Sequence, residues 1–296
     1  MINFIDEKMN IIYSDFIDEL YKEKIYCKLM DLRFNKGHIP DYSQDIIRQY
    51  YLLKYLPAYF VEYYDIYRQA VKLDFINEDF NILSIGCGCG IDLWGCHFVI
   101  KDMEHIKLRY TGLDCIDWDY FDTCGEEAYF IQNSIGELKA LDEDKYNLII
   151  FPKSIGEFSK EDYEVLKKSF ENTNFTKKKI LLIASIRSSE AESDIIRLKE
   201  LVDIFKKKGY SILDDPESYT QYSKKNNGCD YRISDIIPNF QYPEDIRRFL
   251  TSFYKNCLVY RYNCDFCNYE CKSFFIRNPI MTMSKAAHRI IRIKKR

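Results

Sequence analysis

The chain lacks the sequence features that would place it in a membrane or outside the cell. None of its apolar runs approaches the roughly 20 residues that a membrane-spanning helix needs, and its first residues include Asp6 and Glu7 where a secretory signal would be basic. An excess of one charge is also missing, because 43 Lys and Arg residues stand against 46 Asp and Glu residues. We therefore expect a globular protein of the cytoplasm with no membrane contact.

Glycine and proline are scarce, with 11 and 7 residues among 296, so each one is an informative marker of a turn or of the end of a helix or strand. Cysteine is plentiful at 11 residues, and without a secretion signal this number favours reduced thiols or metal ligands over a disulfide framework. Hydrophobic residues make up 47% of the chain, which is enough for a full core. At this length the default expectation is one large α/β domain with additions.

Three of the few glycines fall within five residues. Gly86, Gly88 and Gly90 directly follow the apolar run 82–85, and a segment with helical spacing follows them over 91–100. This order predicts a strand, a tight loop and a helix. A loop without Cβ atoms lets the backbone approach a ligand closely, and the start of the helix offers free N–H donors. The stretch therefore predicts a site for a polar cofactor.

The spacing of these glycines indicates which cofactor. Nicotinamide and flavin folds use G-x-G-x-x-G, whereas here the third glycine comes two residues after the second. The fragment Ile85-Gly-Cys-Gly-Cys-Gly90 resembles motif I of the class I S-adenosylmethionine (SAM)-dependent methyltransferases. The resemblance implies that Gly86, Cys87, Gly88 and Gly90 contact SAM. A glycine-rich turn in some other α/β protein is the alternative.

Polar residues end the next two predicted strands. Residues 108–114 end at Asp114, whose carboxylate can accept hydrogen bonds from both hydroxyls of a ribose, and Asp117 is the alternative if the strand ends later. Residues 128–134 carry Asn133 and Ser134 at their end. The family resemblance implies that Asn133 meets the adenine amino group, with Ser134 beside it.

A fourth strand is predicted from the continuous apolar run that starts at residue 146, which is typical of a parallel strand buried on both faces. The loop 152–157 follows it, and the resemblance implies that this loop, beginning with Pro152, faces the methyl group. Lys153 and Glu157 are the catalytic candidates by position. The loop lacks the Asn-Pro-Pro-Tyr or Asp-Pro-Pro-Tyr signature of amino methylation of adenine and cytosine. Ser84 stands where many members of the family carry an acid near the methionine amino group.

Together these segments predict an α/β fold, a doubly wound and mostly parallel seven-stranded sheet with helices on both faces. Further strands are expected at 179–185 and 210–213, with a helix at 189–208 between them and an antiparallel last strand at 288–293. We divide the chain into a helical N-terminal region (1–78), a SAM-binding core (79–213), an insertion (214–285), and a final strand with a basic tail (286–296).

The N-terminal region is expected to be helical over 3–34 and 46–73. Pro57 should end one helix or begin the next, because proline lacks the N–H that a helix interior needs. Five tyrosines fall four residues apart between Tyr51 and Tyr67. Because four-residue steps drift around a helix, these side chains should wind over its surface, either packing on the sheet or lining the mouth of a substrate site.

The insertion carries Cys257, Cys264, Cys267 and Cys271. A C-x2-C-x3-C run with a fourth cysteine seven residues upstream could place four thiolates around one zinc ion, and for a site in the insertion we expect a role in substrate recognition or in holding the insertion together. An iron–sulfur cluster is the second alternative. Reduced cysteines that bind no metal are the third.

The C-terminal end is basic, with Arg289, Arg292, Lys294, Lys295 and Arg296, and four more cations precede it, namely Arg247, Arg248, Arg261 and Lys272. Such a patch can hold phosphates of a nucleic acid, and a solvated surface is the alternative. For the whole chain we predict a SAM-dependent methyltransferase whose acceptor is an RNA, a protein or a small molecule. A SAM-binding sensor or scaffold subunit without transfer activity is the alternative, and the glycine spacing disfavours a nicotinamide oxidoreductase.

Overall fold

The computed structural model describes residues 1–23, 26–32, 39–103, 106–141, 145–189, 191–222, 231–257, 270–283 and 285–296. The chain forms two compact units, and each is built from two separate stretches of sequence. The first unit comprises residues 1–59 and 232–282, and the second comprises residues 60–231 and 283–296. Helix α2 (Asp45–Lys72) contributes residues to both units.

The second unit is built on a mixed sheet with the order β3-β2-β1-β4-β5-β8-β6. Its strands are β1 (Phe80–Ile85), β2 (Leu108–Asp114), β3 (Glu127–Gln132), β4 (Leu148–Pro152), β5 (Lys179–Arg187), β6 (Tyr210–Ile212), β7 (Thr220–Gln221) and β8 (Ala286–Lys295). Strands β1 to β5 pair in parallel, while β8 runs antiparallel to β5, β6 and β7. This confirms the predicted fold class, including its antiparallel last strand. The short β7 is one strand more than the expected seven.

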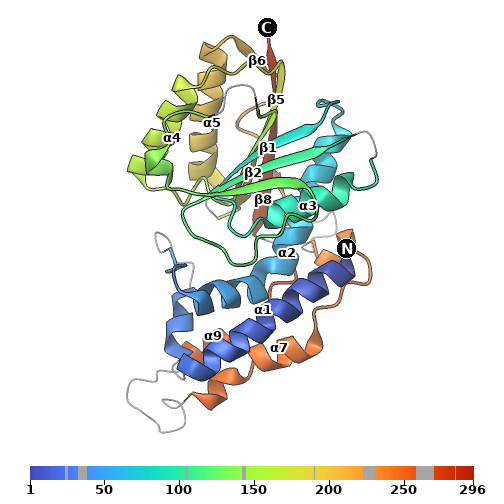
Figure 1. Cartoon of the computed structure of the whole chain (residues 1–296), viewed down its shortest axis with the longest axis vertical. Coiled ribbons are helices and arrows are strands. Elements are labelled where there is room, and N and C mark those ends of the chain that lie inside the picture. The colour runs from blue at the N-terminus through green and yellow to red at the C-terminus, as the bar shows by residue number, and fades with distance from the viewer. Residues whose placement is uncertain are drawn as a thin grey trace. The chain divides into compact units, whose positions relative to one another are not determined.

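Helices cover both faces of this sheet (Figure 1). Helix α3 (Ile91–Ile100) lies on one side, and α4 (Lys160–Asn172) and α5 (Ala191–Lys207) lie on the other. Strand β4 is almost wholly buried because it lies inside the sheet between β1 and β5. Local signals mark the helix ends: the Ser159 hydroxyl accepts from the backbone N–H of Asp162 at 3.0 Å, and Gly209, with φ of 85°, ends the segment that contains α5.

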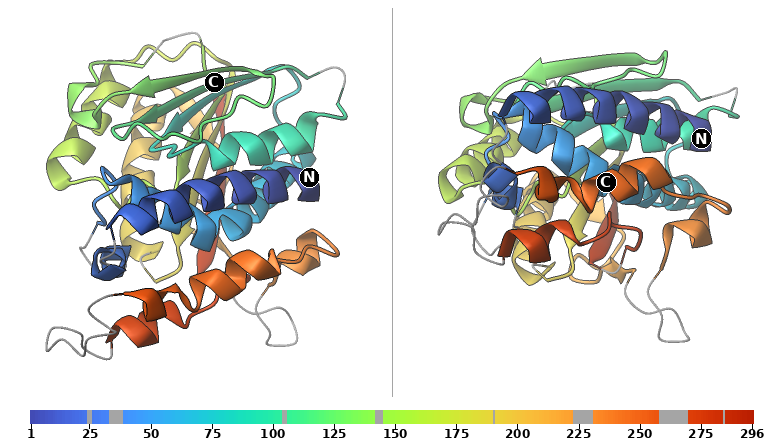
Figure 2. Two further views of the ribbon diagram at one scale, coloured as in Figure 1. Left: turned by 60° about the horizontal axis from the view of Figure 1, so that its bottom comes forward. Right: turned by 90° about the horizontal axis from the view of Figure 1, so that it is seen from below.

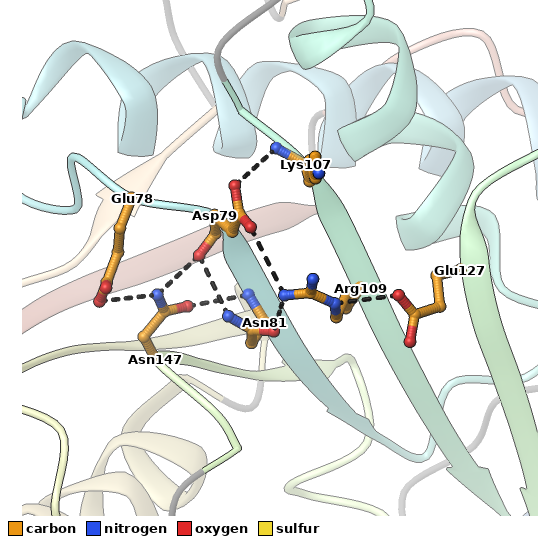
Figure 3. Close-up of polar contacts among 7 residues, drawn as sticks. All are labelled: Glu78, Asp79, Asn81, Lys107, Arg109, Glu127 and Asn147. Atoms are coloured by element: carbon orange, nitrogen blue, oxygen red, sulfur yellow. Dashed lines mark hydrogen bonds and ion pairs between the residues drawn. The ribbon is translucent and has the colours of Figure 1, made fainter.

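A polar network ties together the amino ends of the parallel strands (Figure 3). The buried Asn147 side chain accepts from the backbone N–H of Asn81 at 3.0 Å and donates to the Asp79 carbonyl at 2.8 Å. The Asp79 carboxylate accepts from the backbone N–H of Lys107 at 3.1 Å, and Arg109 bonds to Glu127 at 2.9 Å. Since parallel strands all point the same way, this network fixes the edge of the sheet opposite to the glycine loop.

The first unit is helical and has an aromatic core. It contains α1 (Ile2–Glu23), η1 (Tyr26–Leu32), α6 (Ile233–Ile236), α7 (Glu244–Leu250), η3 (Phe253–Asn256) and α9 (Glu270–Phe275) besides the start of α2 (Figure 2). The buried Phe253 lies at the centre, with ring centroids 5.8 Å from Phe16, 6.0 Å from Tyr50 and 4.9 Å from Phe275. Within the described ranges no helix is long and apolar enough to span a bilayer.

The prediction that Pro57 separates two helices is wrong, because α2 continues through it. Pro57 has no N–H for the carbonyl of Leu53, and its ring crowds the turn before it. The Tyr242 hydroxyl donates to the Leu53 carbonyl at 2.8 Å, and the backbone N–H of Ile280 donates to the Lys54 carbonyl at 2.9 Å. Tyr242, from the distant segment 232–282, therefore supplies the donor that Pro57 lacks, and Ile280 of the same segment bonds to the next carbonyl.

The tyrosines of α2 drift around the helix as expected. Tyr51, Tyr55 and Tyr59 are half-buried and pack ring on ring, with centroids 5.2 Å apart for the first pair and 5.5 Å apart for the second. Tyr63 and Tyr67 are buried. The drift thus leads from half-buried rings at Tyr51 to buried rings at Tyr67, and a role of these side chains at a substrate site stays a prediction.

Candidate cofactor site

The glycine loop follows β1 directly and leads into α3. All three glycines have positive φ, with 73° at Gly86, 56° at Gly88 and 81° at Gly90, where side chains are strained. A Cβ atom on Gly86 would lie 2.3 Å from the Cβ of Ser154. No side chain caps the start of α3 at Gly90. The loop therefore leads into a helix start that has no side-chain cap hydrogen bond among the described residues, an arrangement that suits an anionic or polar group.

Asp114 lies where the sequence places it, at the end of β2 beside this loop. Its Oδ2 accepts from the backbone N–H of Gly88 at 2.8 Å, and its Oδ1 accepts from the N–H of Ile116 at 2.9 Å. Burial raises the pKa of this carboxyl above its ordinary value, and the backbone hydrogen bonds oppose that rise. A carboxylate has about four acceptor positions, so holding the Gly88 backbone is compatible with accepting from a ligand hydroxyl. Asp117 is exposed.

The end of β3 lies next to Asp114. The backbone N–H of Asn133 donates to the Asp114 carbonyl at 2.9 Å, so Asn133 adjoins the end of β2, and its contact with an adenine group stays a prediction. The Ser134 hydroxyl accepts from the N–H of Gly136 at 3.2 Å and caps the short helix η2 (Ile135–Glu137). Ser134 therefore has a local role, and its part in ligand contact stays a prediction.

The loop after β4 packs directly on the glycine loop. Pro152 is the last residue of β4, and the hydroxyl of Ser154 donates to the carbonyl of Ile85 at the end of β1. The structure thus brings together the ends of four parallel strands and the residues predicted for the cofactor. Whether Pro152 contacts a ligand stays a prediction.

Both catalytic candidates are engaged in ion pairs. The ammonium of Lys153 lies 2.8 Å from the Glu62 carboxylate and 3.1 Å from the Ser185 hydroxyl, and the Lys153 and Glu62 side chains are 7% and 2% exposed. Glu157 pairs with Arg187 nearer the surface. Both charged groups therefore already have partners inside the protein. Their catalytic roles stay predictions.

Two buried carboxylates near the site, Asp92 and Glu62, are not among the residues that the sequence predicts for it. Asp92 in the first turn of α3 is fully buried and accepts from the Tyr110 hydroxyl at 2.9 Å, while its Oδ2 and the nearby Ser84 hydroxyl have no hydrogen-bond partner within the described ranges. Glu62 on α2 is 1% exposed. The signal for Asp92 was available, because it is the single acidic residue of the otherwise apolar segment 91–100. No local pattern distinguishes Glu62 from the other polar residues of α2.

The proposed metal site lies mostly outside the described residues. Cys257 is described and buried, whereas Cys264 and Cys267 fall outside the described ranges and the side chain of Cys271 is not described either. Where side chains are described, no group of three or more His, Cys, Asp or Glu residues could hold a metal ion.

Several cations of the predicted basic patch are paired. Arg292 bonds to Asp214 at 2.8 Å, and Arg247 and Arg248 both contact Glu244. Arg261 lies outside the described residues, as does the side chain of Lys272. The part of the patch that is described therefore offers fewer available cations to a phosphate backbone than the sequence suggested.

No family model matches the chain, and no curated protein matches it. Among solved structures, the plantazolicin methyltransferase BpumL in complex with S-adenosylhomocysteine (SAH) is similar at 14% identity, covering 96% of this chain and 99% of that one, with a TM-score of 0.44. A complex of the Trm112 activator and a putative methyltransferase from Haloferax volcanii is 10% identical over 78% of this chain and 90% of that one, with a TM-score of 0.37.

A third similar structure is the phosphoethanolamine N-methyltransferase 2 of Haemonchus contortus with SAH. It is 12% identical, covering 77% of this chain and 52% of that one, with a TM-score of 0.36.

Proposed function

We propose that the protein binds SAM at the glycine loop and transfers its methyl group to an acceptor. The observation that carries the proposal is the junction of the loop 86–90 with Asp114, in which a carboxylate at the tip of β2 holds the backbone of Gly88. The loop backbone and the start of α3 can bind a carboxylate, and the Asp114 carboxylate can bind a ribose. This small region therefore fits a ligand that has both groups.

The fit to SAM can be stated residue by residue. The backbone of Gly86, Gly88 and Gly90 and the start of α3 would take the polar methionine end, and Asp114 would take the ribose, with Asn133 near the base. SAM supplies an activated methyl group on its sulfonium. The chain has to bind and orient the two reactants and exclude water, and these effects alone can lower a barrier substantially.

The acceptor would approach the loop 152–157, which packs on the glycine loop. Because Lys153 and Glu157 are both ion-paired, the structure favours transfer that depends on positioning over transfer that depends on a free base. The same observation favours the second candidate, a protein that binds SAM without transferring its methyl group. RNA, protein and small molecules all remain candidate acceptors.

Calorimetry with SAH tests the binding. Wild-type protein should bind, and Asp114→Ala should weaken binding by about 1.5–3 kcal/mol because a charge-assisted acceptor is lost. Asp117→Ala, a change at an exposed carboxylate three residues away, is the matched control and should leave the affinity unchanged. Tighter binding of NAD than of SAH would contradict the cofactor assignment. Labelled methyl transfer from SAM to cell extract then separates an enzyme from a SAM-binding sensor.

We also propose that Cys257, Cys264, Cys267 and Cys271 bind one zinc ion. The C-x2-C-x3-C spacing and the position of Cys257 upstream support this. Protein purified without added metal should contain about one equivalent of zinc, and the Cys264→Ser, Cys267→Ser double variant should contain none. Cys115→Ser, at an exposed cysteine outside the group, is the control. Metal-free wild-type protein with four titrating thiols in this segment would refute the site.

A further inference from the structure

We propose that Glu62, Lys153 and Ser185 form a buried lock that holds the glycine loop in its binding conformation, so that Lys153 is a positioning residue. The inference rests on the proposed function, because it assumes that the glycine loop is the cofactor site. All three residues belong to the second unit, on α2, on the loop after β4 and on β5.

Lys153 has an unfavourable backbone conformation that its surroundings must maintain. Its φ is 60°, in the left-handed region where a Cβ atom is strained and glycine is not. Its backbone N–H donates to the carbonyls of Phe151 and Ser185, both at 3.0 Å. Strain of this kind persists only where the surrounding structure specifies it.

The side chain of Lys153 supplies a second set of restraints. Its ammonium donates to Glu62 at 2.8 Å and to Ser185 at 3.1 Å, and the Ser185 hydroxyl donates to Glu62 at 2.5 Å. The three groups close a ring of hydrogen bonds in which each residue contacts the other two. Ser185 is fully buried and Glu62 almost so. Hydrogen bonds thus hold both the ammonium and the backbone N–H of Lys153, and Ser185 accepts one from each of them.

The conformation of Lys153 determines where Ser154 lies. The Ser154 hydroxyl donates to the carbonyl of Ile85, the residue before the glycine loop. A Cβ atom on Gly86 would lie 2.3 Å from the Cβ of Ser154, so the two loops are in direct contact at this point. A change of φ at Lys153 would move Ser154 and would remove the surface against which Gly86 is seated.

The chemistry of the pair agrees with a positioning role. Taking an ammonium and a carboxylate out of water is costly, and an apolar pair of similar size often stabilises a fold at least as well. Because this buried pair lies where the two loops meet, its role is to specify one conformation of those loops. The ammonium is also committed to two acceptors inside the protein, which leaves it poorly placed to bind a substrate.

Two double variants separate the backbone from the charge. Glu62→Gln, Lys153→Gly and Glu62→Gln, Lys153→Ala both remove the buried charges together, so neither leaves an unpaired ion. Glycine accepts a φ of 60° without strain, whereas alanine keeps the Cβ atom. We expect the alanine variant to bind SAH about tenfold more weakly than wild type, and the glycine variant to stay within about threefold of it.

Lys167 provides the matched control, because it is an ion-paired lysine inside helix α4. Lys167→Gly should lower the melting temperature more than Lys167→Ala, since glycine is the poorer helix former, and neither should change SAH affinity. Equal loss of SAH affinity in the two Lys153 double variants would overturn the proposal, because the ammonium would then act on the ligand directly. Wild-type affinity in both would also overturn it.

Hydrogen exchange on the ligand-free protein makes the test independent of the proposed function. The amides of 86–90 and 154–157 should exchange faster in the alanine double variant than in the glycine one. Failure of wild-type protein to bind SAH would refute the cofactor site while this difference upholds the lock. Identical exchange in the two variants would refute the lock whatever the ligand.

Discussion

At the scale of single residues, Asp92 is the most unusual group of the structure. It is a fully buried carboxylate with one hydrogen bond, from Tyr110, in a helix whose other residues are largely apolar. Burial raises its pKa from 3.8 to about 6, against the opposing effect of the hydrogen bond from the Tyr110 hydroxyl. A group held this way lowers the stability of the fold at neutral pH.

The sign of the effect follows from proton binding. The carboxyl titrates near 3.8 in the unfolded chain and near 6 in the folded one, so between these values the folded state binds more protons. The free energy of unfolding therefore falls as the pH rises from about 4 to about 6 and stays lower above that, by about 3 kcal/mol in total.

Asp92→Asn removes this pH dependence and keeps the acceptor for Tyr110. We expect the variant to exceed wild type in unfolding free energy by up to about 3 kcal/mol at pH 7.5 and to match it near pH 4. Urea unfolding at the two pH values measures the difference. Asp203→Asn, at a half-exposed carboxylate paired with Lys206, is the control and should show no such pattern. A variant that is less stable than wild type at pH 7.5 would show that the ionised carboxylate is needed for folding.

At the scale of elements, helix α2 shows how a proline is accommodated inside a helix. The carbonyl of Leu53 loses its helical donor to Pro57 and gains the hydroxyl of Tyr242 instead. The donor comes from a segment almost two hundred residues away in sequence, which is why local reasoning placed a helix end here.

Tyr242→Phe tests this exchange of donors. It leaves a buried carbonyl without a partner, so we expect a loss of about 1–2 kcal/mol in unfolding free energy. In a Pro57→Ala background the new backbone N–H can serve the same carbonyl, and the cost of Tyr242→Phe should shrink. A double-mutant cycle by urea unfolding measures this coupling, and a cost that is the same in both backgrounds would contradict it.

Asn147 is the second element-scale test. Its amide donates to the carbonyl of Asp79 and to Glu78, and its oxygen extends the pairing of β4 with β1 (Figure 3). Asn147→Asp keeps the shape but replaces two donors with an acceptor facing other acceptors. We expect a loss of about 2–4 kcal/mol by denaturant unfolding. Asn172→Asp, at an exposed helix end, should cost far less. Similar losses in the two variants would show that the network adds little.

The elements that sequence reasoning recovered are those whose signals are local. Strands β1 and β4 are apolar runs, and the glycine loop joins β1 to α3 as predicted. The features that it missed depend on distant partners, as with Glu62, whose ion pair joins α2 to the loop after β4. Glu62 and Lys153 are 91 residues apart in the sequence, so the spacing of residues near either one does not indicate the pair. The roles of the cofactor residues remain predictions from the motif.

At the scale of the whole molecule, the central fact is that β8 lies inside the sheet. It pairs with β5 at nine positions, from Lys179 with Lys294 to Arg187 with Ala286, and within the described part of the chain β6 and β7 pair with β8 alone. Without β8, both short strands would have no neighbour, and the buried edge of β5 would face water.

Deleting residues 286–296 should therefore prevent the second unit from folding. We expect the truncated protein to lose near-ultraviolet circular dichroism and to bind a hydrophobic dye. Deletion of Arg296 alone, which follows β8, is the control and should leave both signals as in wild type. A truncated protein with the wild-type urea midpoint would show that the sheet is stable without its antiparallel strand.

The position of β8 also sets a delay during synthesis on the ribosome. The nascent chain completes β5, and then residues 188–285 must be translated before its antiparallel partner exists. At ordinary elongation rates this takes roughly 5–20 s. Throughout that interval Ile180, Leu182 and Ile186, all buried in the finished protein, lie along an unpaired strand edge. This edge is therefore open to wrong pairing until the sheet closes, which happens only when translation has passed residue 295.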